Sequence, residues 1–201
     1  MKHYRRIEQT RSPRERILIL CEGKKTEPNY FKSIKAGKPK TSAVRIEVAN
    51  TKKNTAKELV DEAIRLMNKA KSEDKNPYNE VWVVFDRDGY TKHPEAFNRA
   101  NSKNIKIAFS STCFEFWLLL HFEYTTYSFS NCDDAIRRLK AHIPDYEKGG
   151  EHFALLQPKI NDAIKNGGKI IAHCNKTGNS QIWEYNPYTD VGLLVEKLLN
   201  M

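Results

Sequence analysis

Short apolar runs alternate with longer amphipathic segments through the first half of the chain. The runs expected to form strands are Arg16 to Cys21, Val44 to Val48, Val81 to Phe85 and Ile105 to Ser110. Unbroken apolar runs such as Val81 to Phe85 are typical of strands covered on both faces, as in a parallel sheet. The polar segments between the runs are therefore expected to supply the covering helices.

Amphipathic periodicity predicts helices in the intervals between these runs. The longest begins at about Thr55 and carries a single apolar stripe, formed by Ala56, Leu59, Val60, Ala63, Ile64 and Met67. A shorter helix is expected after Thr26, and another around Pro94 to Asn101. Strands and helices that alternate in this way indicate a mainly parallel sheet with right-handed crossovers.

After Ser110 the pattern becomes helical. Helices are expected at Cys113 to Phe122, at Asn131 to Ala141, around Phe153 to Asn166 and after Pro187. We therefore expect an α/β protein with a mainly parallel central sheet flanked by helices and a helical C-terminal part. Its parts are a basic arm (1–15), an α/β core (16–112) and a helical layer or subdomain packed on the core (113–201), with joints expected at Gly149-Gly150 and Gly167-Gly168.

The charge balance of the chain indicates a class of partner. With 39% apolar and 29% charged residues, the 201-residue chain is long enough for one sizeable core. Its 34 Lys and Arg residues outnumber 25 Asp and Glu residues, which gives a formal charge of +9. Basic residues concentrate at Lys2 to Arg16, Lys24-Lys25, Lys32 to Lys40 and Lys52-Lys53. This excess favours a polyanionic partner such as nucleic acid.

The sequence also bears on compartment and redox state. No apolar stretch approaches the ~18 residues needed to span a bilayer, and the charged N-terminus does not resemble a signal peptide. A cytoplasmic protein without a membrane partner is expected. The cysteines show no paired spacing, and they are Cys21, Cys113, Cys132 and Cys174. We expect reduced, mostly buried thiols rather than a disulfide framework or a zinc site.

Acidic residues stand directly after two of the apolar runs. Glu22 follows Cys21, and Asp86 and Asp88 follow Phe85. Ligands in open α/β sheets bind where parallel strands end, and side chains two apart on an extended chain point to the same side. Three carboxylates gathered in one cleft require a cation, and Mg²⁺ combines carboxylate ligands with substrate phosphates. The sequence thus predicts metal-assisted phosphate chemistry.

Four distinctive blocks of sequence are spread over nearly the whole chain. They are Glu22-Gly23-Lys24-Lys25-Thr26-Glu27-Pro28-Asn29-Tyr30-Phe31, Val84-Phe85-Asp86-Arg87-Asp88, Cys113-Phe114-Glu115-Phe116-Trp117-Leu118-Leu119-Leu120-His121-Phe122 and Asn186-Pro187-Tyr188-Thr189. In this order the blocks resemble the RloB-like family. A strand ending in glutamate and a later strand ending in Asp-x-Asp also resemble the Toprim fold of topoisomerases, primases and several nucleases. Thr112 departs from the family pattern, in which a proline is expected before the third block. The departure concerns that loop and not the acidic residues.

The resemblance implies a Toprim-type, metal-dependent nuclease of bacterial phage defence, often encoded beside an ATPase partner. Glu22, Asp86 and Asp88 would be the catalytic, metal-binding set, with Mg²⁺ or Mn²⁺ as the cofactor. Asp86 and Asp88 would share one ion, while Glu22 would bind a second ion or act as general base, and both roles stay open. The substrate would be nucleic acid, with transfer RNA, other RNA and DNA all compatible with a basic cleft.

Other residues in the same blocks are candidates for supporting roles. Lys24 and Lys25 would bind substrate phosphates, the alternative being solvated loop lysines. Glu115 is a further candidate catalytic residue, with a dipole-stabilising acid at a helix N-terminus as the alternative. His121 lies six positions later and on a different helix face. Among leucines and phenylalanines it is expected to be a core histidine rather than a ligand.

Two other functions compete with the nuclease. The strand end Phe85 to Gly89 also resembles a haloacid-dehalogenase-like phosphatase, in which Asp86 would be the covalent nucleophile and Asp88 the acid. That family requires a later acidic cluster at a strand end, whereas Asp133-Asp134 open a predicted helix, and it gives Glu22 no role. The second alternative is a non-catalytic nucleic-acid-binding subunit of a defence complex, with a structural metal.

Overall fold

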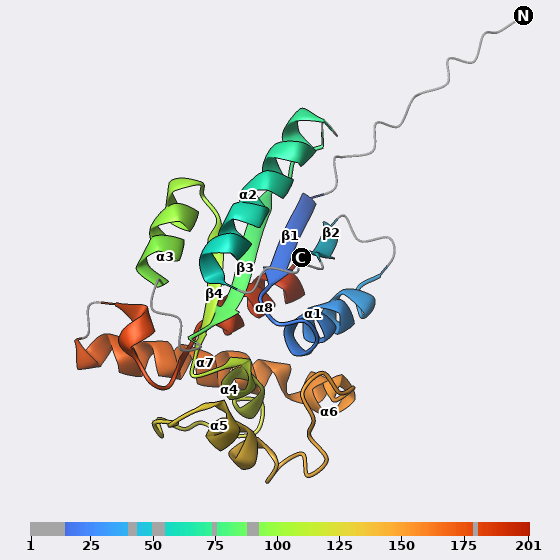
Figure 1. Cartoon of the computed structure of the whole chain (residues 1–201). Helices are drawn as coiled ribbons and strands as arrows, with labels where there is room; N and C mark the ends of the chain where they lie inside the picture. The colour runs from blue at the N-terminus through green and yellow to red at the C-terminus, as the bar shows by residue number, and fades with distance from the viewer. Residues whose placement is uncertain (1–14, 40–43, 50–54, 74–75, 88–92, 179–180) are drawn as a thin grey trace, which may run out of the picture.

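The computed structural model describes residues 15–39, 44–49, 55–73, 76–87, 93–178 and 181–201 (Figure 1). It confirms the expected α/β fold, with a five-stranded, mostly parallel sheet flanked by helices and a helical C-terminal part. No helix in these ranges is long and apolar enough to cross a membrane. The strands are β1 (Glu15–Cys21), β2 (Val44–Ala49), β3 (Glu80–Asp86), β4 (Lys106–Ser111) and β5 (Tyr188–Thr189). The α-helices are α1 (Thr26–Ala36), α2 (Ala56–Ser72), α3 (His93–Ser102), α4 (Phe114–Leu119), α5 (Cys132–Leu139), α6 (Phe153–Leu156), α7 (Ile160–Thr177) and α8 (Val191–Leu199), with short 3₁₀ turns at Gln157–Lys159 and Ile182–Glu184.

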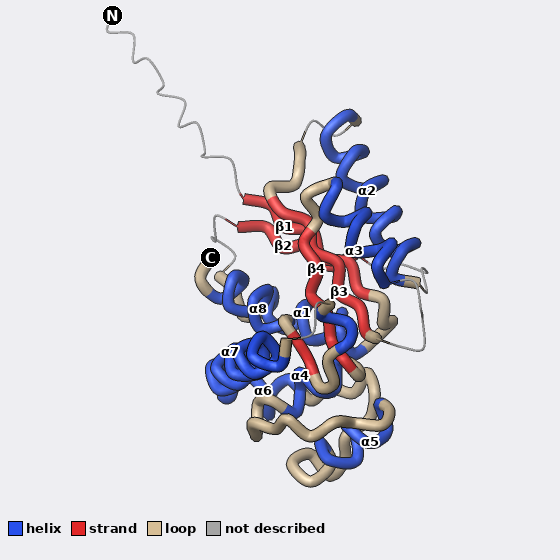
Figure 2. Tube along the Cα trace, turned by 90° about the vertical axis from the view of Figure 1, so that its left-hand side faces the viewer, coloured by secondary structure: helices blue, strands red, loops and turns tan. Residues whose placement is uncertain are grey.

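The strand order in the sheet is β2-β1-β3-β4-β5. Strands β1 to β4 are parallel, and β5 pairs antiparallel with β4. Helices α2 and α3 cover one face, and α1, α7 and α8 lie on the other (Figure 2). The chain runs outward from β1 to β2 and then crosses back to β3, so its direction across the sheet reverses between β1 and β3. Ligands in open α/β sheets bind at such a switch point.

The two strands that lead to the acidic residues are enclosed on both faces. Ile17 to Cys21 and Val81 to Phe85 are all buried, as their unbroken apolar runs predicted. On one face they are covered by the stripe of α2, where Leu59, Val60 and Ala63 are fully buried. Helix α2 begins where expected, because the Thr55 hydroxyl accepts a hydrogen bond from the Glu58 N–H at 3.3 Å.

The C-terminal part completes the sheet as well as covering it. Tyr188 and Thr189 pair with Ser111 and Ser110 of β4. Helix α8 then packs on β4, and α7 packs on α8. The apolar pattern did not indicate β5, because two residues are too few to show a period of two.

The expected joint at Gly167-Gly168 is wrong, since both glycines lie inside α7. Gly167 is buried against α4, and a Cβ added to it would lie 3.6 Å from Trp117 Cζ3. Its small size therefore allows the two helices to approach closely. By contrast, Gly149 has a φ of +80° in a loop, a conformation that favours glycine.

The expectation of four reduced thiols is also wrong. Cys113 and Cys132 form a disulfide with a Cα–Cα distance of 5.6 Å, whereas Cys21 and Cys174 are buried free thiols. Burial raises the pKa of the Cys21 thiol well above its ordinary value, so Cys21 is not a thiolate nucleophile. Cys113 precedes α4 and Cys132 begins α5, and the packing of these helices brings the two sulfur atoms together. Spacing along the chain carries no signal of that contact.

Candidate active site

Three acidic residues lie at the carboxyl ends of three neighbouring strands. Glu22 follows β1, Asp86 ends β3, and Glu115 lies in the first turn of α4, directly after β4. Because β1, β3 and β4 are adjacent in the sheet, these side chains are brought to one edge. Glu22 and Asp86 flank the switch point between β1 and β3. Asp88, the third predicted metal ligand, lies outside the described residues.

The backbones of β1 and β3 hold Glu22 and Asp86 in direct contact. The Glu22 N–H donates to the Val84 carbonyl at 2.9 Å, which continues the strand pairing one residue beyond Cys21. The Asp86 N–H in turn donates to Glu22 Oε2 at 3.3 Å. The Glu22 carboxylate is therefore positioned over the end of β3, beside the Asp86 side chain.

Asp86 is oriented from its other side by the start of α4. The Phe114 N–H donates to Asp86 Oδ2 at 3.0 Å. Strand pairing continues here too, since the Arg87 N–H donates to the Ser110 carbonyl at 2.9 Å. The Asp86 carboxylate thus links the end of β3 to the first residue of α4, one position before Glu115.

Glu115 is buried rather than solvated, with a relative exposure of 2%. The Tyr146 hydroxyl donates to Glu115 Oε1 at 3.0 Å, and Lys148 Nζ lies 3.8 Å from the same oxygen. Burial and the negative charge of Glu115 raise the pKa of Tyr146 above its ordinary value, so the phenol stays protonated and donates. Glu115 is therefore a buried carboxylate that is fixed by hydrogen bonding and faces the other acids of the cleft. It differs in this from the solvent-exposed acid that only stabilises a helix dipole.

Glu27 is a fourth acidic residue of the site, and it is not among the site residues predicted from the sequence. Burial raises the pKa of its carboxyl, a hydrogen bond from its own backbone opposes the rise, and the charge of Glu115 adds to it. The carboxyl also lies against Gly23, where an added Cβ would come within 1.9 Å of Glu27 Oε2. The sequence did contain a signal for Glu27. Its spacing from the apolar residues Tyr30, Phe31 and Ile34 places it on the same, buried face of α1.

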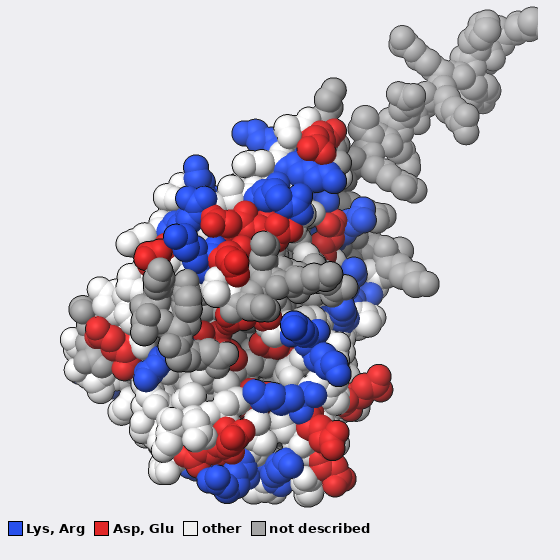
Figure 3. All heavy atoms as spheres, viewed as in Figure 1, with Lys and Arg blue, Asp and Glu red and all other residues white. Residues whose placement is uncertain are grey.

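The four carboxylates line a cleft of about 420 Å³ that also carries lysines. Its lining residues are Glu22, Gly23, Lys24, Lys25, Thr26, Glu27, Asp86, Glu115 and Lys148. Lys24, Lys25 and Lys148 are exposed to solvent. Figure 3 shows acidic atoms in the middle of this face with Lys and Arg atoms beside them. The cleft therefore combines an acidic floor with a basic margin.

A loop from the C-terminal part fixes the basic margin. The Gly149 N–H donates to Thr26 Oγ1 at 3.0 Å, and Asn29 Nδ2 donates to the Gly149 carbonyl at 3.1 Å. Lys25 runs along this loop, because a Cβ added to Gly149 would lie 2.6 Å from Lys25 Cβ. Residues far apart in sequence are thus tied together beside the acids.

His121 lies in the core and not in the cleft. Its Nε2 is 3.1 Å from the Tyr30 hydroxyl, and its Nδ1 is 3.1 Å from the Trp117 carbonyl. Burial lowers the pKa of His121 to about 4, so the ring is neutral, with the Nδ1 proton donated to the carbonyl. It is a satisfied core histidine, as the surrounding apolar residues predicted.

Comparison with known proteins assigns the chain to a family. A family model described as RloB-like protein matches residues 17–198. The matched region includes every described residue of the cleft. No curated protein and no solved structure matches the chain. Because the match spans nearly the whole sequence, the chain belongs to the RloB-like protein family.

Proposed function

We propose that this protein is a metal-dependent, Toprim-type nuclease that cleaves RNA or DNA in bacterial antiviral defence. The observation that carries the proposal is the meeting of Glu22 and Asp86 at the switch point of the sheet, where the Asp86 N–H donates to the Glu22 carboxylate. The proposal includes a cytoplasmic site of action. It also includes an ATPase partner from the same locus, because the sequence has no Walker-type phosphate-binding loop.

The donor set of the cleft fits a hard divalent cation. Its acidic groups offer only oxygen ligands, which Mg²⁺ and Mn²⁺ prefer. The negative charge of Glu115 contributes to the raised pKa of Glu27, and a cation among these groups relieves such repulsion. Glu22 and Asp86 would hold the ion, with Asp88, outside the described residues, as the third proposed ligand. When bound, the ion would polarise a phosphodiester and lower the pKa of an attacking water.

The chain's own residues would position the substrate around that ion. Lys24 and Lys25 are exposed beside Glu22 and would bind phosphate oxygens as point charges. Glu115 is held by Tyr146 and faces the same cleft, which places it to orient or accept a proton from a water. These contacts read the phosphate backbone, so we expect little dependence on base sequence.

A haloacid-dehalogenase-like phosphatase accounts less well for the same cleft. It gives no role to Glu22, which lies in direct contact with Asp86. The later acidic pair Asp133-Asp134 lies in the first turn of α5. The Asp134 N–H donates to the N-cap residue Asn131, and the Asp134 carboxylate pairs with Arg137 at 3.0 Å. These contacts are those of a helix terminus, with no sign of a catalytic cluster.

The decisive experiment is to incubate the purified protein with total RNA and with plasmid DNA, in Mg²⁺ or Mn²⁺, with and without the neighbouring ATPase. Cleavage is expected only with metal and is expected to be lost in Glu22→Gln. The matched control is Asp61→Asn, and this variant should still cleave. Asp61 lies in α2 and pairs with Arg99 of α3, on the face of the sheet that these two helices cover. Absence of cleavage under all conditions, or a phosphoaspartate trapped at Asp86, would contradict the proposal.

A further inference from the structure

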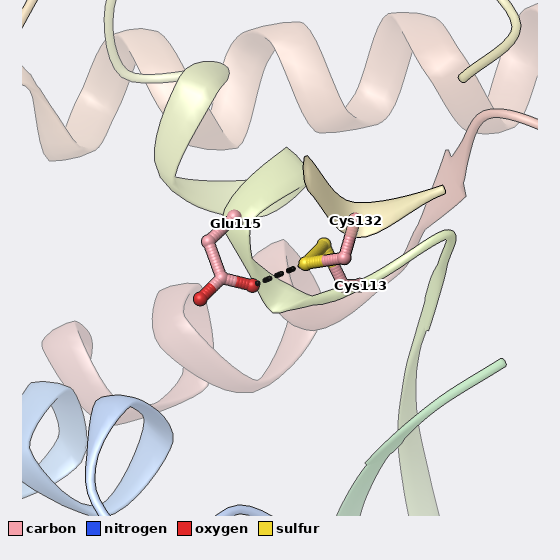
Figure 4. A group of neighbouring side chains, drawn as sticks. All are labelled: Cys113, Glu115 and Cys132. Carbon is pink, nitrogen blue, oxygen red and sulfur yellow. Dashed lines mark hydrogen bonds between the residues drawn. A yellow bond between two sulfur atoms is a disulfide. The ribbon is translucent and has the colours of Figure 1, made fainter. Parts of the chain in front are cut away.

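A second group of ligand-type side chains lies immediately behind Glu115. Cys113, Glu115 and Cys132 come from the start of α4 and the start of α5, and their ligand atoms lie within 4.8 Å of one another (Figure 4). Cys113 and Glu115 are buried and Cys132 is half-buried. In the oxidised protein the two sulfur atoms are joined. The group therefore consists of two sulfurs and one carboxylate at a single buried point.

The two oxygens of Glu115 face different partners. Oε1 accepts from Tyr146 and lies near Lys148 on the cleft side. Oε2 is directed toward the sulfurs and lies 3.2 Å from Cys132 Sγ. A disulfide sulfur carries no proton, so this contact is a hydrogen bond only when Cys132 is a thiol. The placement of Oε2 thus suits the reduced pair, or a cation held by it.

We propose that Cys113, Cys132 and Glu115 Oε2 form a zinc site when the cysteine pair is reduced. Sulfur ligands lie about 2.3 Å and carboxylate oxygens about 2.0–2.2 Å from zinc, so three atoms grouped this closely reach one ion after small side-chain rotations. A water, entering beside the half-buried Cys132, completes four ligands. The Tyr146 hydroxyl orients the ligating carboxylate through its hydrogen bond to Glu115 Oε1, as polar groups behind zinc ligands usually do.

The chemistry balances in two steps. A small dithiol first supplies two electrons and two protons to the disulfide and is itself oxidised to a disulfide, which leaves two protein thiols. Zinc then displaces both thiol protons and binds the resulting thiolates. Two thiolates and one carboxylate with Zn²⁺ leave a net charge of −1, and Lys148 lies 3.8 Å from Glu115 to offset it. A disulfide oxidant that accepts two electrons from the thiolates re-forms the protein disulfide, which removes two ligands and releases the ion.

This zinc site is chemically distinct from the proposed magnesium site in the cleft. Thiolates select soft ions such as zinc, whereas the cleft offers carboxylate oxygens. Glu115 is shared, with Oε1 facing the cleft and Oε2 facing the sulfurs. Zinc binding can be measured without any cleavage assay, so it can succeed or fail independently of the nuclease proposal.

The test compares the full-length protein in two redox states. The disulfide is first reduced with a phosphine, which contains no thiol and is converted to its oxide. The remaining phosphine is then removed in the absence of air, and the reduced protein is titrated with Zn²⁺. The reduced protein is expected to bind one more equivalent than the oxidised protein, in which, of the two described sites, only the cleft carboxylates can bind the ion. Co²⁺ in place of zinc is expected to give a thiolate-to-metal charge-transfer band in reduced wild type. Bound zinc should also protect Cys113 and Cys132 from alkylation and leave the labelling of Cys174 unchanged.

Variants identify the ligands. Cys132→Ser is expected to lose zinc binding, and Cys174→Ser, which removes a buried thiol outside the group, is expected to retain it. Tyr146→Phe keeps all three ligands and should weaken zinc affinity roughly 10–100-fold. Because loss of the disulfide can also affect folding, the wild-type Co²⁺ spectrum and alkylation pattern are decisive. No charge-transfer band and no protection in reduced wild type would overturn the proposal, as would full zinc affinity in Cys132→Ser.

Discussion

Negative charge is crowded where β1 and β3 end. Glu22, Asp86, Glu115 and Glu27 line one cleft, and the raised pKa of Glu27 reflects both its burial and the charge of Glu115. Gathering like charges in a partly dry site costs free energy, which a bound cation or a protonated carboxyl offsets. In a site of this kind, one side chain can lower stability and still be needed for function.

Asp86→Asn is expected to abolish cleavage while leaving the fold intact. The asparagine retains an oxygen that can accept from the Phe114 N–H, and removal of one charge relieves repulsion with Glu22. The free energy of unfolding without metal should therefore stay within about 1 kcal/mol of wild type or rise. Melting curves with and without Mg²⁺, beside an activity assay, test both parts. A variant that still cleaves would remove Asp86 from the proposed catalytic set.

Asp190 provides a pH-dependent contribution to stability that is separate from the cleft. Its Oδ1 accepts from the Phe109 N–H at 2.6 Å, and burial raises the pKa of Asp190 to about 7. In the unfolded chain the pKa of an aspartate is about 3.9, so the folded protein binds the proton more tightly. Stability from this group is complete below about pH 4 and is lost as the pH rises through about 7.

Asp190→Asn should remove the loss of stability that Asp190 causes as the pH rises. The amide is neutral at every pH and keeps an oxygen for the Phe109 N–H. The stability difference between variant and wild type should therefore shift in favour of the variant by a few kcal/mol between about pH 4 and pH 7. Chemical denaturation of both proteins across this range measures it. A difference that does not change with pH would show that Asp190 titrates normally.

At the residue scale, the acids that could be predicted were those whose position follows from a strand. Glu22 and Asp86 stand at the ends of unbroken apolar runs, and the carboxyl ends of parallel strands share one edge. Glu27 lies in a helix and depends on which face of α1 is buried. The link of Cys113 to Cys132 depends on the packing of α4 on α5, which no local pattern encodes.

At the scale of elements, α7 shows how a glycine pair can be misread. Gly167 and Gly168 resembled a joint, yet both lie inside an 18-residue helix. Gly167 meets Trp117, while a Cβ at Gly168 would have no atom within 4 Å. The first glycine therefore serves packing, and the second only lowers helix stability.

Gly168→Ala is accordingly expected to stabilise the protein by about 0.5–1 kcal/mol. For a domain of this size that corresponds to a rise in melting temperature of roughly 2–4 °C. Gly149→Ala is the opposite case, because Gly149 has a φ of +80° and an added Cβ would lie 2.6 Å from Lys25 Cβ. That variant should be destabilised. If Gly168→Ala also lowered the melting temperature, α7 would not be continuous at this point.

The helices and parallel strands were predictable because each is long enough to show its own period. Strand β5 is only two residues long, and it joins the sheet through Ser110 and Ser111 of β4. Its pairing comes from a contact between residues nearly eighty positions apart. Elements held by such contacts carry almost no signature in the local sequence.

At the scale of the whole molecule, strand order determines where the acids meet. The order β2-β1-β3-β4 could not be read from the sequence, because the same alternation of strands and helices is compatible with several arrangements. Once β1 lies beside β3, Glu22 and Asp86 become neighbours at the switch point. The chain has a net charge of +9, and in the cleft the acids are flanked by lysines.

Nucleic acid binding is expected to be salt-dependent and largely indifferent to base sequence. Lysines contact phosphates by displacing counterions, so the logarithm of affinity falls linearly with the logarithm of salt concentration. Each cleft lysine that contacts a phosphate adds about one to that slope. Replacing both Lys24 and Lys25 with alanine should make the slope shallower by about two, measured by fluorescence anisotropy on a labelled RNA and on DNA.

The matched control removes the same amount of charge elsewhere. Lys69 and Lys71 are exposed at the end of α2, on the face of the sheet opposite α1. Their double alanine variant has the same net charge as the cleft variant, so equal losses of affinity would mean that only overall charge matters. A loss of affinity in the Lys24 and Lys25 variant alone would instead place the phosphate backbone beside Glu22 and Asp86. Affinity that does not change with salt in wild type would contradict the basic-margin interpretation, because displaced counterions are its physical cause.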